Sequence, residues 1–143
     1  MEAARKLGVQ PHILHASNEA DFESAFANLR RVRAGGLVIS NSPIFVSRTE
    51  QLGTLTLRHA IPSIFQFREF AAAGGLMSYG TNATHSLHLI GGYVGRILKG
   101  EKPADLPVQQ ATKIEFIINL KTANALGLAV PQSIQLRADE VIE

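Results

Sequence analysis

The sequence has no cysteine, little net charge and no apolar run long enough to cross a membrane. Without cysteine, the chain has no disulfides, no thiolate nucleophile and no cysteine-bound zinc. A membrane-spanning helix needs about 20 consecutive apolar residues, and no run approaches that length. The net charge of +2 comes from 14 basic and 12 acidic residues scattered along the chain, so composition gives no reason to expect a nucleic-acid partner.

Common nucleotide-binding and catalytic motifs are also missing. There is no Gly-Lys-Ser or Gly-Lys-Thr for a phosphate-binding loop, and no G-x-G-x-x-G after a strand. A nucleophile elbow needs G-x-S-x-G, and Ser78 lacks the leading glycine at that offset. His85 and His88 are three residues apart without a third suitable ligand nearby, so we predict no metal site and no cofactor.

What is present is the composition of one globular domain. The chain has 143 residues, of which 45% are hydrophobic and 18% charged, enough to bury a core. Apolar runs that are typical of strands alternate with helical patterns, which predicts repeated β-α units. We therefore expect an α/β fold, a three-layer parallel sheet with helices on both faces. The expected strands cover residues 9–16, 37–39, 63–67, 75–80, 113–120 and, weakly, 134–136.

The expected helices follow from apolar spacing and capping residues. Phe22, Phe26 and Leu29 lie on one stripe of a helix that begins after Ser17 or Asn18. Ser42 as N-cap and Pro43 as first residue predict a single helix to about His59. A long helix runs from Thr81 or Asn82 to Lys99, an extended connector covers 101–110, and a short helix covers 121–126.

Polar and aromatic residues follow the ends of successive predicted strands. In a parallel sheet these ends share one edge, where ligands collect. Aromatic rings supply contact area, while hydroxyl, amide and guanidinium groups orient a small polar or zwitterionic ligand. The same residues would also suit loop ends that are only capped and solvated. The candidate ligand-binding residues are Asn41, Ser42, Phe45, Phe67, Arg68, Ser78 and Tyr79.

Several separate motifs occur in one order over nearly the whole chain. They lie at 67–70, 74–80, 97–100, 102–107, 119–123, 126–128 and 136–142. In this order they resemble the C-terminal half of a family of ABC-transporter substrate-binding proteins. The resemblance implies a type I periplasmic-binding-protein fold, in which two α/β lobes close on a small ligand.

The resemblance also implies a division of the chain and a set of partners. Residues 1–80 would form most of the second lobe, residues 81–120 would cross toward the first lobe and back, and residues 121–143 would return to the second. Relatives of this kind are associated with uptake of aromatic amino acids, so the expected partners are a small solute and a membrane permease. Such proteins work in the periplasm or otherwise outside the cytoplasm.

The chain departs from that family in length. Family members are about twice as long and carry a signal sequence, whereas residues 1–7 lack the apolar core of one. The chain could be a domain of a longer protein, a truncated product, or a subunit whose copies cover each other. Leu87, Ile90 and Val94 would face water without the first lobe, which favours self-association, and we predict a homodimer.

Three functional classes follow. The resemblance favours a non-enzymatic solute-binding module. A small flavodoxin-like enzyme, with Glu69 or a histidine as general base, is the second class. An interaction domain that binds no ligand is the third.

Overall fold

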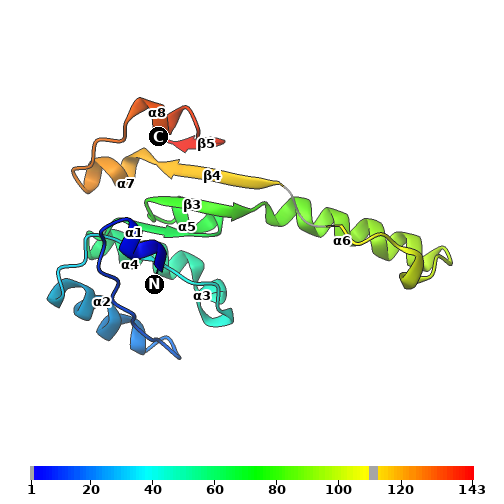
Figure 1. Ribbon diagram of the computed structural model, residues 1–143, viewed down its shortest axis with the longest axis horizontal. Coiled ribbons are helices and arrows are strands. Elements are labelled where there is room, and N and C mark those ends of the chain that lie inside the picture. The colour runs from blue at the N-terminus through cyan, green and yellow to red at the C-terminus, as the bar shows by residue number, and fades with distance from the viewer. Residues whose placement is uncertain (1, 110–112) are drawn as a thin grey trace. The chain divides into compact units, whose positions relative to one another are not determined.

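The computed structural model describes residues 2–109 and 113–143, and the chain divides into two compact units, Met1–Ala34 and Gly35–Glu143. The first unit contains α1 (Glu2–Lys6) and α2 (Asp21–Arg31), drawn in blue in Figure 1. Phe22, Phe26 and Leu29 are buried, as the apolar stripe predicts. The Asp21 carboxylate accepts from the N–H of Ser17, with a donor–acceptor distance of 2.7 Å, which fixes the entry into α2.

The strand expected at Val9–Ala16 does not form. No described strand pairs with this segment, and the side chains of Val9 and Ile13 are 56% and 67% exposed. A strand needs a neighbour for its N–H and C=O groups, and Pro11 has no N–H to donate. The prediction of a strand here is wrong for this structure.

The second unit is built on a five-stranded sheet of order β1-β2-β3-β4-β5. These strands are β1 (Leu37–Val38), β2 (Ser63–Phe65), β3 (Met77–Thr81), β4 (Ile114–Asn119) and β5 (Glu140–Ile142). The α/β fold class is confirmed, but the sheet is mixed. β1, β2 and β3 are parallel, β4 is antiparallel to β3, and β5 is parallel to β4.

The direction of β4 follows from the long excursion between β3 and β4. The chain leaves the end of β3 into α6 (Ala83–Leu98) and comes back beside that same end. The N–H of Asn82 donates to the carbonyl of Lys113 at 3.0 Å, which sets the register of the returning strand. A chain that returns to the end it left must run antiparallel.

The helix expected from Pro43 to His59 is two helices, α3 (Pro43–Ser47) and α4 (Thr49–Arg58). Arg48 between them has φ −122° and ψ 26°, outside the helical region. The Thr49 hydroxyl donates to the carbonyl of Val46 at 2.9 Å and so replaces a backbone donor there. The single-helix prediction missed this break.

The C-terminal region also differs from prediction. The weak strand expected at residues 134–136 does not form, because residues 134 and 135 belong to α8 (Gln132–Gln135), and the last strand is β5. Pro131 precedes α8, and its carbonyl accepts from the N–H of Ile134 at 2.9 Å, which closes the first turn. The Asp139 carboxylate accepts from the N–H of Phe116 at 2.8 Å and aligns β5 with β4.

One face of the sheet carries α5 (Arg68–Ala72), which packs on β2, β3 and β4. Phe70 and Ala71 on this helix are completely buried, and the Phe70 ring meets Phe65 edge-on with ring centres 5.8 Å apart. Asn119 joins the helix to β4, because its side-chain N–H donates to the carbonyl of Ala71 at 2.8 Å. Its Oδ1 accepts from the N–H of Thr122 and caps α7 (Leu120–Ala125).

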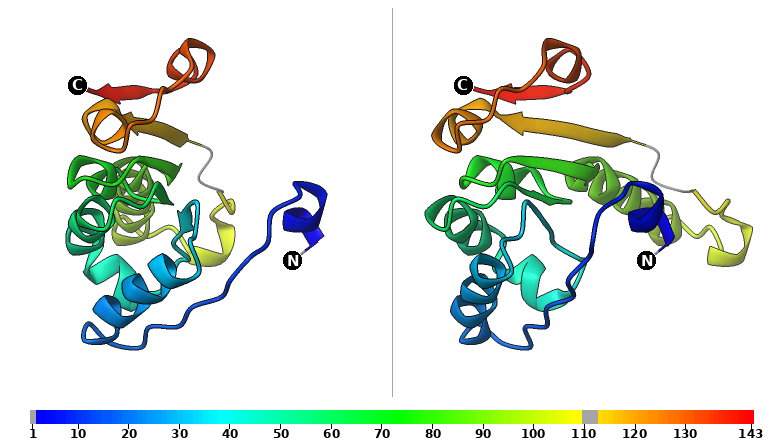
Figure 2. Two further views of the ribbon diagram at one scale, coloured as in Figure 1. Left: turned by 90° about the vertical axis from the view of Figure 1, so that its left-hand side faces the viewer. Right: turned by 60° about the vertical axis from the view of Figure 1, so that its left-hand side comes forward.

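Helix α6 continues past the end of β3, as Figure 2 shows in green. Among its described residues none is buried, and Leu87, Ile90 and Val94 are 67%, 56% and 49% exposed. The connector after it contains a short 3₁₀ helix, Pro103–Asp105, and its last predicted residue, Gln110, lies outside the described residues. In the described part of the chain, no helix is long and apolar enough to cross a membrane.

β4 belongs to the same sheet as β1–β3. The predicted division of the chain between two lobes, at residues 80 and 120, stays a prediction.

Candidate functional site

The carboxyl ends of β2 and β3 lie at the same edge of the sheet, because the two strands are parallel neighbours. Gln66 and Phe67 follow β2, and Asn82 follows β3. β4 runs the other way, so Glu115 near its start also reaches this edge, paired with Gly80. An edge of this kind is where α/β sheets present ligand-binding groups.

A small hollow of about 60 Å³ opens at this edge. We call it the rim hollow. Its volume suits a single polar head group, since a water molecule occupies about 30 Å³ in the liquid. It is lined by Gln66, Phe67, Arg68, Glu69, Ser78, Gly80, Thr81, Asn82, Ala83, Thr84, Glu115 and Ile117.

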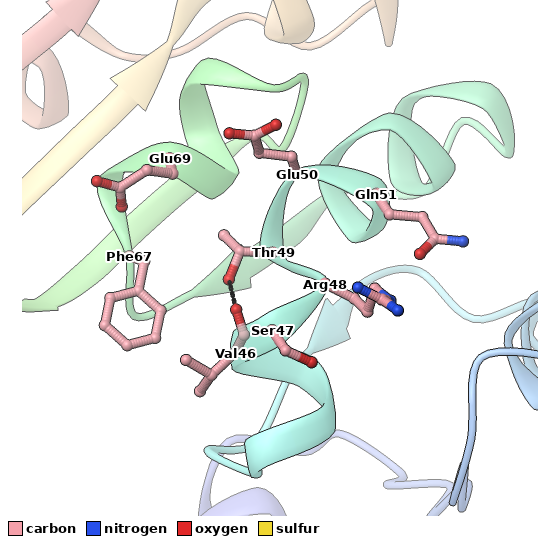
Figure 3. Close-up of a pocket in the computed structure, with 8 residues that line it drawn as sticks. All are labelled: Val46, Ser47, Arg48, Thr49, Glu50, Gln51, Phe67 and Glu69. Atoms are coloured by element: carbon pink, nitrogen blue, oxygen red, sulfur yellow. Dashed lines mark hydrogen bonds between the residues drawn. The ribbon is translucent and has the colours of Figure 1, made fainter.

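A larger cleft of about 470 Å³ shares Phe67 and Glu69 with the rim hollow. We call it the helix cleft. Figure 3 shows the Phe67 ring beside Val46 and Thr49, at the break between α3 and α4. The two spaces therefore adjoin at a half-buried aromatic ring, whose edge-on contact with Phe65 has ring centres 5.5 Å apart. The helix cleft is lined by Val46, Ser47, Arg48, Thr49, Glu50, Gln51, Phe67 and Glu69.

Arg68 forms a two-point ion pair with Glu140. Its Nε donates to Glu140 Oε2 at 2.7 Å, and its Nη2 donates to Oε1. The hydrogen bond and then the charge of Glu140 raise the pKa of Arg68, and the same contact lowers the pKa of the Glu140 carboxyl. One side of the guanidinium that was expected to hold a ligand is thus occupied within the chain.

Asn82 and Glu115 form a second polar pair at the rim. Asn82 Nδ2 donates to Glu115 Oε1 at 2.6 Å, and Lys113 Nζ lies 3.3 Å from the same oxygen. Asn82 also caps α6, because its Oδ1 accepts from the N–H of His85. Sequence reasoning treated Asn82 only as a helix cap and missed Glu115, whose signal was a single carboxylate inside an apolar strand.

Ser78 and Tyr79 point to opposite faces of the sheet, as neighbours on a strand must. Ser78 is 2% exposed and lines the rim hollow. Tyr79 is 57% exposed and meets Phe116 edge-on, with ring centres 6.2 Å apart, in a separate cleft of about 520 Å³ beside α8. The structure therefore brings Phe67, Arg68 and Ser78 together, but not Tyr79.

The remaining predicted residues line neither the rim hollow nor the helix cleft. Asn41 is exposed, Ser42 precedes α3, and Phe45 is half-buried within α3. Ser42 has the extended backbone of an N-cap, without a side-chain capping hydrogen bond among the described residues. Within residues 2–109 and 113–143, His85 and His88 belong to no cluster of three or more potential metal ligands.

A family model described as "ABC transporter substrate binding protein" matches residues 1–142. The chain belongs to this family. The match covers all the elements from α1 to β5, so the resemblance read from separate motifs is confirmed. This is a family of transporter substrate-binding proteins rather than of enzymes. No curated protein matches the chain.

Solved structures agree on the fold. A conserved domain protein from Vibrio cholerae superposes with a TM-score of 0.84 at 23% identity, covering 98% of this chain and 47% of that one. The ABC domain in complex with L-Trp from Streptococcus pneumoniae gives 0.82 at 23% identity, covering 99% and 48%. The ligand-free, open structure of CD0873, a substrate binding protein with adhesive properties from Clostridium difficile, gives 0.62 at 19% identity, covering 99% and 47%.

This substrate-binding family member spans about half the length of the structures it matches.

Proposed function

We propose that the chain supplies one wall of a solute-binding cleft and that its ligand is a small amino-acid-like molecule taken up by an ABC transporter. The observation that carries the proposal is the family match over residues 1–142. The L-Trp complex among the similar structures is the reason for choosing an amino acid as the ligand class to test.

The geometry of the rim fits such a ligand. The rim hollow is small and polar, whereas the helix cleft beside it is larger and carries the Phe67 ring. An amino acid has the same division, with a compact polar head and a side chain. We assign the head to the rim hollow and the side chain to the helix cleft, with Phe67 between them.

The second wall would come from the half of the relatives that this chain does not match. Ligand contacts made by both walls would favour the closed form, and a membrane permease would recognise that form. The rim residues are then one side of a clamp and contribute only part of the binding energy.

Calorimetric titration of the full-length protein that carries this chain tests the proposal. L-tryptophan, L-tyrosine and L-phenylalanine are the probes, and saturable binding of at least one is expected. Phe67→Ala should weaken that binding roughly 10-fold or more, because a buried aromatic contact contributes about 1–3 kcal/mol. Tyr79→Ala should weaken it far less. Absence of binding by all three would contradict the proposal, and loss at Tyr79 with none at Phe67 would move the site to the opposite face.

A further inference from the structure

The sheet has an apolar face that helix α5 does not cover. Phe65 meets Phe70 of α5, and neighbours on a strand point to opposite faces, so Ile64 lies on the face away from α5. We call it the back face. The register of the paired strands puts these residues on it: Val38, Ile64, Met77, Tyr79, Thr81, Ile114, Phe116, Ile118 and Val141. All of them except Thr81 are apolar.

Much of the back face is open to water in the described chain. Ile118 is buried, but Val38 on β1 is 80% exposed and Ile114 on β4 is 50% exposed. Ile64 and Met77 are half-buried. β1, β2 and β3 are parallel, and parallel strands in α/β proteins are covered on both faces, because apolar side chains are more stable away from water. The back face therefore needs a cover.

The cleft of about 520 Å³ beside α8 forms one end of the back face, and it has two charged residues in its lining, Arg137 and Asp139. The Asp139 carboxylate accepts from the N–H of Phe116 at 2.8 Å. The exposed guanidinium of Arg137 has no hydrogen-bond or ion-pair partner among the described residues. An apolar cleft bordered by such a group complements an amphipathic partner that carries a carboxylate.

The extent of the back face favours a helix over a small molecule. Its apolar residues continue from the cleft to Val38 on the edge strand β1, which does not line the cleft. A small molecule in the cleft would leave Val38 in water, whereas a helix about 10 Å across can pack along several strands. The chain covers only 47% and 48% of the Vibrio and Streptococcus structures, so a protein of their length has further polypeptide to supply that helix.

We propose that the back face is the docking surface for an amphipathic helix of the full-length protein, from the part that this chain does not span, and that a carboxylate on this helix pairs with Arg137. The helix packs behind β3 and β4, whose residues Ser78 and Glu115 line the rim hollow from the other face. It supports the strands that carry the candidate site without touching the ligand. The inference needs no ligand, so it stands apart from the solute-binding function proposed above.

Thiol labelling tests this docking surface, since the 143 residues contain no cysteine. Val38→Cys and Ile114→Cys are made singly in the full-length protein, with any cysteine elsewhere replaced by serine. Labelling by iodoacetamide without ligand is followed by mass spectrometry, and each rate is divided by that of the same variant unfolded in urea. Both should be slowed roughly 10-fold or more, because only an accessible thiol reacts. Lys121→Cys, at an exposed position of α7, is the control and should be slowed no more than about twofold.

Arg137→Gln should speed labelling of both protected thiols roughly two- to fivefold, the range expected for an exposed ion pair, whereas Lys121→Gln should not. Labelling of Val38→Cys and Ile114→Cys as fast as Lys121→Cys would overturn the docking surface. Protection that disappears on dilution would assign the face to a second copy and overturn the helix of the same chain. Labelling unchanged by Arg137→Gln would overturn the acidic partner. Failure of the amino-acid probes to bind while both thiols stay protected would contradict the proposed function and leave this inference standing.

Discussion

At Gly80 the backbone of β3 passes very close to Gln66, at the floor of the rim hollow. A Cβ atom at this position would lie 2.3 Å from the carbonyl oxygen of Gln66 and 2.9 Å from its Cβ. The carbonyl oxygen belongs to the backbone directly after β2, so it cannot move without shifting the end of that strand. Position 80 therefore requires glycine. The absence of a side chain there lets the ends of β2 and β3 come together.

Gly80→Ala should lower the free energy of unfolding by about 1–3 kcal/mol, the usual cost of forcing atoms into a packed site. Gly91→Ala is the control, because nothing lies within 4 Å of a Cβ there and alanine favours an exposed helix. Denaturant unfolding of the two variants measures the difference. A Gly80→Ala protein as stable as the wild type would contradict the close packing.

The Arg68–Glu140 pair predicts a pH dependence. The pKa of Glu140 is lowered in the folded chain from its ordinary value of 4.5 by its hydrogen bond to Arg68. A carboxyl with a lowered pKa stabilises the fold above its unfolded pKa, and that contribution is lost as the pH falls through the folded value. The side chains are 49% and 38% exposed, so the contribution is about 0–1 kcal/mol.

The stability difference between wild type and Glu140→Gln should therefore shrink as the pH falls from neutral to about 3. Urea unfolding at several pH values measures it, and Glu143→Gln should show no comparable trend. A difference that stays constant or grows at low pH would mean that the pair does not act through the Glu140 charge.

Phe67, Arg68 and Ser78 could be predicted as neighbours because parallel strands end at one edge. The sequence could not predict which of Ser78 and Tyr79 faces the rim hollow, because the run at 75–80 is apolar without clear alternation. The pairing with β4 decides which face of the sheet each residue takes. The ion pair between Arg68 and Glu140 could not be predicted, because the two residues are 72 positions apart in sequence.

Among the described elements, the long helix α6 buries none of its residues. Leu87, Ile90 and Val94 are all about half exposed or more, and they recur at helical spacing on one side. A cleft of about 760 Å³ lies between this helix and the connector that follows it, where the Tyr93 hydroxyl donates to the carbonyl of Pro107. Exposed apolar patches of this kind favour association.

Self-association of the 143-residue chain through α6 stays a prediction, and Ile90→Glu tests it. A charge in the middle of the apolar side should lower the apparent mass at high concentration, as measured by sedimentation. His88→Glu, an exposed position on another side of the helix, should leave association unchanged. If the wild type sediments as a monomer at every concentration, the dimer prediction is wrong.

At this scale the existence of elements was easier to predict than their partners. Helices α2, α4 and α6 follow apolar stripes that are local in sequence, and Asn82 and Asn119 cap α6 and α7, although Arg48 breaks one predicted helix. The segment Val9–Ala16 has the residue types of a strand, but it pairs with none of the described strands. β4 was found as a strand, whereas its antiparallel direction depends on where α6 returns the chain.

For the whole molecule, the central fact is that a chain matched over residues 1–142 by a substrate-binding family model covers about half of each similar structure. Family and fold could be predicted from the order of motifs. A binding site could be predicted at a sheet edge, but the full lining of the rim hollow could not, because Glu115 reaches it only through the antiparallel return of β4.

Mapping the binding site by NMR is the most direct test of the account. L-tryptophan is titrated into the isotope-labelled full-length protein, and the shifts of backbone amides are followed. We predict that within this chain the largest changes fall at 66–69, 78–84 and 115, around the rim hollow. Saturable binding with changes confined to Tyr79, Phe116 and Arg137 on the opposite face would contradict the account.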